Sequence, residues 1–315
     1  MKPAQIFHQY IWIINTLRAY RELTFEELNR KWQQDGVIDG NVLQRSSFNR
    51  HRVAILDMFG IIIDCDKKTY KYSISNPQVL SNDSIERWLF STLTVHGMLA
   101  DSAAVKDRLV LENAPVGEQY LDIIIRAIRT DRRLLIGYKK FEAEGYEKTV
   151  CPYALKLFHQ RWYLLACLDP HPTEGAPCDV QQMRIYALDR MTMVELTDEP
   201  FEMPVDFSPQ AYFSEYYGVL TDETPLEHVV IRAHKWMANY LRTLALHPSQ
   251  QELESGAITH GDTPPTPYTD FSYDLRPTSD FLGELLRHSD GIEVLKPDHL
   301  RQKMRQMIAE TLKRY

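Results

Sequence analysis

Two short stretches in the middle of the chain alternate their side chains as β-strands do. The first covers residues 161–166 and the second covers residues 184–190. In a strand the side chains repeat every second residue, so alternate residues share one face. The side chains that this rule groups are Arg161 and Tyr163 in the first stretch and Arg184, Tyr186 and Arg190 in the second. We expect the two groups to converge on one surface of a sheet.

The residue types in this expected surface suit an anionic, aromatic ligand. Arginine offers a rigid fork of donors for phosphate, and tyrosine offers a flat ring and a hydroxyl, so the surface fits a nucleotide or a single nucleic-acid strand. The candidate ligand-binding residues are Tyr153, His159, Arg161, Tyr163, Arg184 and Arg190. For some of them a structural role is an open alternative: Tyr153 and Tyr163 as core tyrosines, His159 as a hairpin turn, and Arg190 as an ion-pair partner of Asp189.

Three short motifs carry a resemblance to a known family. They are Trp162-Tyr163-Leu164, the upstream Pro152-Tyr153-Ala154-Leu155, and the downstream Arg184 with Leu188-Asp189-Arg190-Met191. In this order they resemble the WYL domain, a small Sm-like or SH3-like β-barrel of bacterial transcription regulators that usually follows a winged helix-turn-helix. The resemblance extends over nearly the whole chain, and it implies an α+β multidomain protein.

Composition limits the possible architectures and settings. A chain of 315 residues is long enough for two or three domains. The net charge is −7, but residues 197–229 hold eight acids and no Lys or Arg, so basic side chains are concentrated elsewhere. The four cysteines include no Cys-x-x-Cys pair, which predicts a reduced, cytoplasmic protein. We expect no signal peptide and no membrane-spanning helix.

The first 76 residues have the order of a winged helix-turn-helix. Apolar spacing predicts a helix over residues 6–17, and the capping box Thr24-Phe25-Glu26-Glu27 predicts the start of a second helix. A third helix is expected from Ser46 or Ser47 to Gly60. Two strands around a turn at residues 66–68 would form the wing.

The expected DNA contacts lie at the start of the third helix and at the tip of the wing. They are Arg45, Ser46, Ser47, Asn49, Arg50 and His51 on the helix, and Lys67 and Lys68 on the wing. The recognition helix of WYL regulators typically carries a Thr-hydrophobic-x-Arg-Asp pattern. The run Ser47-Phe48-Asn49-Arg50-His51 resembles this pattern, with His51 in the place of the acid. Three helices and a hairpin also build protein-docking modules, which is the alternative reading.

The rest of the chain divides into four further segments. Linker helices are expected over residues 77–133, including helices at 81–99 and 119–131. The barrel is expected over 134–200, with five short strands and a surface loop at 169–179. An acidic connection would cover 201–225. Residues 226–315 alternate helices and strands and resemble the C-terminal extension of WYL proteins, a small ferredoxin-like α+β unit.

These expectations combine into one functional hypothesis. The chain would be a ligand-responsive, DNA-binding transcriptional regulator whose barrel senses a nucleotide or a single-stranded nucleic acid. The resemblance further implies a homodimer, and we expect no cofactor or metal. The alternative is a module that binds RNA or single-stranded DNA, with the N-terminal part used for protein docking. An enzyme is not expected, because the sequence has no Gly-x-Ser-x-Gly, phosphate-binding glycine loop or His-Glu-x-x-His motif.

Overall fold

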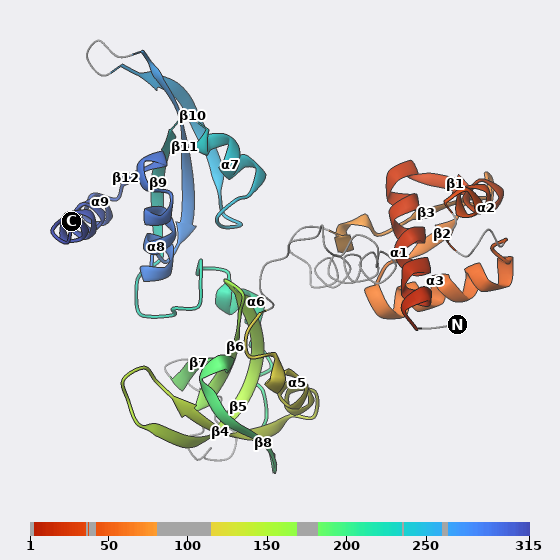
Figure 1. Cartoon of the computed structure of the whole chain (residues 1–315), viewed down its shortest axis with the longest axis horizontal. Helices are drawn as coiled ribbons and strands as arrows, with labels where there is room; N and C mark the ends of the chain where they lie inside the picture. The colour runs from red at the N-terminus through yellow and green to blue at the C-terminus, as the bar shows by residue number, and fades with distance from the viewer. Residues whose placement is uncertain are drawn as a thin grey trace. The chain divides into compact units, whose positions relative to one another are not determined.

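The computed structural model describes residues 3–35, 37, 42–80, 115–168, 182–234, 236–259 and 264–315. The chain forms two compact units, Met1–Glu112 and Asn113–Tyr315, and Figure 1 shows their elements. The expected helix at 81–99 and the expected loop at 169–179 lie outside the described residues.

The N-terminal unit combines three helices with a small antiparallel sheet. Its elements are α1 (Pro3–Tyr20), β1 (Glu22–Thr24), α2 (Phe25–Gln34), α3 (Arg45–Phe59), β2 (Ile63–Cys65), β3 (Lys71–Ile74) and the 3-10 turn η1 (Pro77–Leu80). The strand order is β1-β3-β2. The three expected helices and two wing strands are therefore present. The short strand β1 was not expected, and it pairs with β3 along the edge away from β2.

Local sequence signals set the ends of these helices. The Thr24 hydroxyl accepts the amide of Glu27, while the Glu27 carboxylate accepts the amide of Thr24 at 2.8 Å, which completes the predicted capping box at α2. Helix α3 ends at Gly60, whose φ of 61° places it in the left-handed region that glycine tolerates. The helices meet over a core in which Trp32, Phe48 and Phe59 are fully buried.

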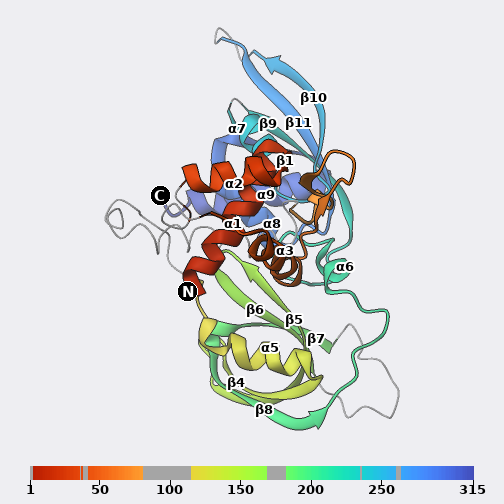
Figure 2. The same cartoon turned by 90° about the vertical axis from the view of Figure 1, so that its right-hand side faces the viewer.

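The second unit begins with a five-stranded antiparallel sheet and one helix. Its elements are the 3-10 turn η3 (Glu118–Tyr120), α5 (Leu121–Arg129), β4 (Arg132–Lys139), β5 (Gly145–Phe158), β6 (Arg161–Leu168), β7 (Met183–Ala187), the 3-10 turn η5 (Leu188–Arg190) and β8 (Met191–Pro200). The strand order is β7-β6-β5-β4-β8, and all five expected strands are present. Figure 2 shows α5 lying across this strongly curved sheet.

The two faces of the sheet bury different partners. On one face, Leu164 and Ala166 of β6 pack with Ile124 and Ala127 of α5. On the other face, Leu165 and Cys167 belong to a second cluster, which also includes Phe201 from the segment after β8. That segment contains the short helix α6 (Pro209–Phe213). Because both faces are covered here, residues 164–167 are uniformly apolar instead of alternating with polar residues.

The C-terminal part has the element order β-α-β-β-α-β followed by one more helix. Its elements are β9 (Glu227–His234), α7 (Met237–Thr243), β10 (Gln251–Ile258), β11 (Thr266–Leu275), α8 (Ser279–Arg287), the 3-10 turn η6 (Ser289–Gly291), β12 (Ile292–Lys296) and α9 (Asp298–Leu312). The sheet order is β10-β11-β9-β12. Alternate residues of β9 and β11, such as Ile231 and Phe271, pack with α7 and α8. Strand β10 was not expected, because nearly all of its residues are exposed and it has no apolar alternation.

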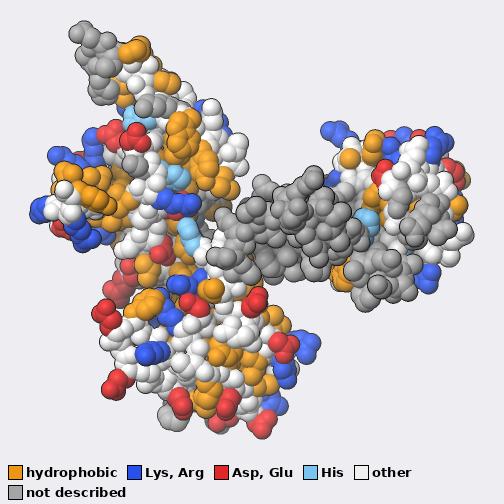
Figure 3. Space-filling model, viewed as in Figure 1, with side chains coloured by type: hydrophobic (Ala, Val, Ile, Leu, Met, Phe, Trp, Pro, Cys, Tyr) orange, Lys and Arg blue, Asp and Glu red, His pale blue; other side chains and the backbone are white. Residues whose placement is uncertain are grey.

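Helix α9 carries apolar side chains beyond the part that its own domain buries. Leu300 and Met304 belong to the core, whereas Ile308 is 54% exposed and Leu312 is 71% exposed. Figure 3 shows hydrophobic and basic side chains next to each other over this helix. The end of α9 is therefore a partly apolar surface.

Candidate functional site

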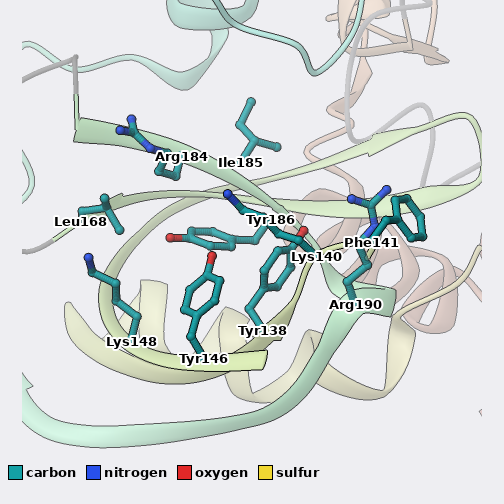
Figure 4. A pocket seen from close by; sticks show the side chains of 10 residues that line it. All are labelled: Tyr138, Lys140, Phe141, Tyr146, Lys148, Leu168, Arg184, Ile185, Tyr186 and Arg190. Carbon is teal, nitrogen blue, oxygen red and sulfur yellow. The ribbon is translucent and has the colours of Figure 1, made fainter. Parts of the chain in front are cut away.

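A hollow of about 650 Å³ opens on the curved sheet of the second unit. It lies where β4, the start of β5, the end of β6, β7 and η5 come together. The residues that line it are Tyr138, Lys140, Phe141, Tyr146, Lys148, Leu168, Arg184, Ile185, Tyr186 and Arg190. We call this hollow the barrel pocket, and Figure 4 shows it from close by.

Three tyrosines form the centre of the barrel pocket. Tyr138 and Tyr146 occupy paired positions in β4 and β5, and their ring centroids lie 6.0 Å apart. Tyr186 of β7 meets Tyr138 edge to face, at 5.0 Å between centroids. The Tyr138 hydroxyl accepts the amide of Ala187 at 3.3 Å, which fixes that ring against β7. These contacts hold the aromatic floor in place before any ligand binds.

Four cationic side chains surround this floor. They are Lys140, Lys148, Arg184 and Arg190, and the described residues that line the pocket include no carboxylate. In Figure 4, Arg184 and Lys148 lie to one side of the tyrosines and Arg190 lies to the other. The pocket therefore has a positive potential that favours an anion.

The two pocket arginines are held differently. Arg190 stacks over the exposed ring of Phe141, with 3.7 Å from the guanidinium carbon to the ring centroid. Its Nε atom is buried and has no hydrogen-bond partner among the described residues. Arg184 is exposed and donates from Nη1 to the Met183 carbonyl at 2.7 Å.

Burial raises the pKa of two of the pocket tyrosines, Tyr146 and Tyr186. Desolvation raises the pKa of Tyr186, with a further contribution from neighbouring Tyr146. The pKa of Tyr146 is also raised, mainly by burial and then by Tyr138. Both hydroxyls therefore keep their protons at neutral pH and can donate hydrogen bonds. These two hydroxyls therefore add no negative charge to oppose the four cations.

The expected convergence of Arg161 and Tyr163 with Arg184 and Tyr186 is wrong. In the register of β6 and β7, Leu164 pairs with Tyr186, Ala166 pairs with Arg184, and Tyr163 pairs with Ala187. Paired residues in antiparallel strands point to the same face. Tyr186 and Arg184 therefore lie on the face of the α5 core, whereas Tyr163 and Arg161 lie on the opposite face.

The other candidate ligand residues have different surroundings. Tyr153 is buried, with its ring stacked on Phe201 at 5.9 Å and meeting Phe207 at 5.1 Å. Burial raises the pKa of Tyr153 to about 12. His159 occupies the two-residue turn between β5 and β6, with a positive φ of 45°. Of the six candidate residues, the barrel pocket includes Arg184 and Arg190.

Arg161 has an acidic partner that the sequence suggested for another residue. Its Nε atom lies 3.2 Å from the Asp189 carboxylate. The sequence alternative pairs Asp189 with Arg190, but Arg190 instead stacks on Phe141.

Half of the lining residues come from a hairpin that contains none of the expected site residues. Tyr138 lies at the end of β4 and Lys140 directly follows that strand, while Tyr146 and Lys148 lie two residues apart at the start of β5. A sequence signal for these four residues exists. On each side of a short turn, a tyrosine is followed two positions later by a lysine. Phe141 at the turn completes the set.

A second basic surface lies on α3 of the N-terminal unit. Ser46, Asn49 and Arg50 are exposed at helical spacing and so share one side of the helix. Ser47 is half-buried, and its hydroxyl accepts a hydrogen bond from Arg50 at 3.1 Å. The exposed side is polar and basic near the start of the helix, where recognition helices contact base edges.

The remaining two candidate DNA residues of α3 make contacts inside the unit. Arg45 lies 3.3 Å from the Glu26 carboxylate in an exposed ion pair. His51 is half-buried and meets the ring of Tyr10 edge to face, at 5.3 Å between centroids. Burial, and next the positive charge of Arg50, lower the pKa of His51. His51 therefore points toward α1.

The turn between β2 and β3 presents two lysines. The Asp66 carboxylate accepts the amide of Lys68 at 2.8 Å and the hydroxyl of Thr69 at 3.0 Å. These hydrogen bonds also lower the pKa of Asp66. The side chains of Lys67 and Lys68 are exposed. The acid at the base of the turn thus holds the backbone while the lysines face solvent.

The described residues also bear on metal sites and membrane spans. Within the described ranges, no group of three or more His, Cys, Asp or Glu side chains could hold a metal ion. Among the helices that the structure describes, none is long and apolar enough to cross a membrane.

Comparisons with known proteins agree with the sequence resemblance. The WYL domain matches residues 119–196, and the WCX domain matches residues 225–312. No curated protein matches the sequence. The chain therefore carries a WCX domain after a WYL domain. The chain belongs to the WYL domain-containing transcriptional regulators.

Two solved structures are similar to most of the chain at low identity. One is the proteasome accessory factor B/C (PafBC) of Arthrobacter aurescens, with 17% identity and a TM-score of 0.34 over 96% of this chain and 46% of that chain. The other is a CRISPR Cas-related protein, with 11% identity and a TM-score of 0.39 over 99% of this chain and 85% of that chain. This chain thus spans about half the length of the PafBC chain.

Proposed function

We propose that the protein is a ligand-responsive, DNA-binding transcriptional regulator. In this proposal the N-terminal unit binds double-stranded DNA, and the barrel pocket binds a nucleotide or a single-stranded nucleic acid. Both activities are binding events, and neither uses a catalytic group.

The barrel pocket carries the ligand part of the proposal. In a protein of net charge −7, it gathers four cations around an aromatic floor with no acid among its described lining residues. Arginine and lysine bind phosphate oxygens, and neutral tyrosine rings stack on bases of any sequence. An Sm-like barrel over residues 134–200, with α5 packed against it, would hold this site.

The N-terminal unit carries the DNA part. We assign residues 1–76 to a winged helix-turn-helix, with α3 as the recognition helix and the β2–β3 turn as the wing tip. The exposed side of α3 offers Asn49 and Arg50, residue types that read bases in the major groove. Lys67 and Lys68 would contact phosphates.

The C-terminal part completes the proposed assembly. We assign residues 226–315 to a ferredoxin-like unit, supported by the sheet order β10-β11-β9-β12 with helices α7 and α8 on one face. Residues 77–133 would be linker helices, and residues 201–225 would be the acidic connection. We also propose a homodimer, which would place two recognition helices on a pseudo-palindromic operator.

A second candidate function follows from apolar side chains on α3. Val53 is 59% exposed and Leu56 is 44% exposed, both in the later half of the helix. Exposed apolar groups on a helix are typical of a protein-docking surface. In this alternative the barrel handles RNA or single-stranded DNA, and the N-terminal unit docks a protein partner.

Fluorescence-polarisation binding distinguishes the two functions. The purified protein is titrated in rising salt onto the duplex upstream of its own gene, a random duplex and a single strand of equal length. The main proposal predicts saturable preference for the upstream duplex and separate binding of the single strand. Binding of the single strand with no duplex binding at any salt concentration would favour the alternative.

A further inference from the structure

A lysine of the barrel reaches the backbone of the acidic connection. The Nζ atom of Lys156, in β5, donates to the Gly218 carbonyl at 2.6 Å. The same ammonium lies 4.2 Å from the ring centroid of Phe213 in α6. Lys156 therefore ties β5 to residues that lie far beyond the barrel in sequence, and its charge is largely removed from solvent.

A carboxylate of the C-terminal domain holds the same piece of backbone from the other side. Asp280, in the first turn of α8, accepts the amides of Val219 and Leu220 with one oxygen, at 2.8 Å each. The Gly218 carbonyl and the Val219 amide belong to one peptide group. This peptide therefore lies between an ammonium on its carbonyl side and a carboxylate on its amide side, an arrangement that matches its dipole.

Close packing allows only glycine at the centre of this contact. A Cβ atom added to Gly218 would lie 2.2 Å from Oδ2 of Asp280 and 2.6 Å from its Cβ atom. Any other residue would force α8 away from the connection. We call the contact of Lys156, Gly218 and Asp280 the junction.

Aromatic rings extend the junction between the same elements. Phe158 of β5 meets Tyr217 at 5.6 Å between centroids, and Tyr217 meets Phe281 of α8 at 5.9 Å. Burial, and then the Glu284 carboxylate, raise the pKa of Tyr217, so its hydroxyl stays neutral. The end of β5 is thus joined to α8 by a polar contact and an aromatic contact side by side.

The strand that ends at the junction begins in the barrel pocket. Tyr146 and Lys148 of β5 line the pocket. Residues 145–150 pair with β4, whereas residues 150–158 pair with β6, and the register with β6 shifts between Pro152 and Ala154. A register shift of this kind bends a strand locally. The pocket half and the junction half of β5 therefore meet at a bend.

We propose that the junction transmits occupancy of the barrel pocket to the C-terminal domain. The inference rests on the proposed ligand binding by that pocket. A phosphate bridging Lys148 of β5 and Arg184 of β7 would draw the first half of β5 toward the sheet edge. The second half would turn at the bend and change the position of Lys156 relative to α8.

Coupling of this kind requires the ligand to bind one arrangement of the junction more tightly than another. Such coupling is also reciprocal. Ligand binding at the pocket changes the equilibrium between arrangements of the junction by some factor, and a change of arrangement at the junction alters the ligand affinity of the pocket by that same factor. The ionisable groups that face Lys156 are Asp280 of α8 and His247 of the loop before β10. Burial lowers the pKa of Lys156 to about 8, which leaves the lysine mainly charged at neutral pH.

Hydrogen–deuterium exchange of the full chain tests the proposal, with a ten-nucleotide single strand of thymidines as the probe. Lys156→Met keeps an apolar stem against Phe213 and removes the donor. Asp280→Asn is the second variant, because it keeps an acceptor for the two amides and removes the charge. Lys313→Met, at the exposed C-cap of α9, is the matched control.

The proposal predicts that the probe changes exchange at residues 214–220 and 279–287 by about twofold or more in the wild type and the control. In Lys156→Met this response is lost, while probe affinity stays within roughly threefold of the wild type. A response that persists in both junction variants would overturn the proposal. So would a wild type that binds the probe with unchanged exchange in these segments.

A measurement without ligand distinguishes failure of the junction proposal from failure of the proposed function. If the wild type does not bind the probe, the ligand part of the proposed function fails. The junction itself is then tested by Lys156→Met alone, which should speed exchange at residues 214–220 without changing the barrel strands. Unchanged exchange there would show that Lys156 does not hold the connection.

Discussion

The N-terminal helix α3 and the barrel pocket show how differently two candidate sites follow from sequence. On α3, the exposed side could be predicted from the spacing of Ser46, Asn49 and Arg50 alone. At the barrel, candidate residues from neighbouring strands separated onto opposite faces, with Arg184 on one and Arg161 on the other. One site depends on a single element, and the other depends on how several elements pair.

The difference has a physical cause. A helix has its own period of 3.6 residues, so neighbours on its surface are known once the helix is known. A sheet has a period of two, and a shift of one residue in the pairing moves every side chain to the opposite face. Register is set by turns and core packing between distant segments, and the sequence pattern of either strand alone does not contain it.

We expect the largest effect from a substitution on the buried side of the barrel, measured as a loss of unfolding free energy. Tyr153→Ala removes a ring that stacks on Phe201 and meets Phe207 edge to face, and a cavity at such a site costs about 3 kcal/mol. Chemical denaturation should show this loss of unfolding free energy, with oligonucleotide affinity nearly unchanged at temperatures where the variant is folded. A large loss of affinity with little loss of stability would place Tyr153 at the ligand instead.

The next effect compares the two faces of the barrel directly. Arg184→Ala combined with Arg190→Ala should weaken binding of a single-stranded oligonucleotide by roughly thirtyfold, because two charged donors at the pocket are lost. Arg161→Gln is the matched control on the opposite face, and we expect less than about a twofold change from it. Equal losses in both variants would refute the assignment of the site to one face.

We expect a smaller loss of affinity from substitutions in the proposed DNA-binding surface of the N-terminal unit. Arg50→Ala combined with Lys67→Ala should weaken duplex binding by about tenfold and reduce the salt dependence by roughly two charges. Binding of the single strand should not change, because the barrel pocket is intact. Polarisation titrations at several salt concentrations measure both quantities, and a parallel loss of single-strand binding would argue against two separate sites.

The smallest effect concerns His51, which packs against Tyr10. Because the pKa of His51 is lowered in the fold, the unfolded state binds its proton more readily. Stability should fall as the pH drops below the unfolded value of about 6.5 and level off below the folded pKa. His51→Phe should remove that part of the decline, a difference of about 2 °C in Tm between pH 7 and pH 5.

His247 also has a pKa lowered by burial, so wild-type unfolding alone cannot isolate His51. The difference between the wild type and His51→Phe does isolate it, since His247 is common to both. Identical pH profiles for the two proteins would mean that His51 is solvated in the folded state.

Some structural elements could be predicted from the sequence, and others could not. The capping box at Thr24 and the αL glycine at Gly60 could be predicted, because each is a local signal with a known geometry. Strand β10 could not, because an exposed edge strand has no buried face to impose alternation. The short strand β1 depends entirely on its pairing with β3.

The barrel pocket illustrates the same limit at the level of a site. Arg184 could be selected from its own strand, but its neighbours Tyr138 and Lys148 come from a hairpin that reaches it through three strand pairings. The face of Arg161 was decided by the same pairings. Residue chemistry therefore indicated the kind of ligand, whereas the members of the site required the fold.

In a ligand-responsive regulator, occupancy of the barrel pocket changes the affinity for DNA, and this change can be measured. Affinity for the upstream duplex is determined with and without a saturating single-stranded oligonucleotide, in the wild type and in Arg184→Ala combined with Arg190→Ala. A ligand-responsive regulator predicts a change of about fivefold or more in the wild type and none in the pocket variant. A wild type that binds the oligonucleotide and the duplex independently would contradict the claim.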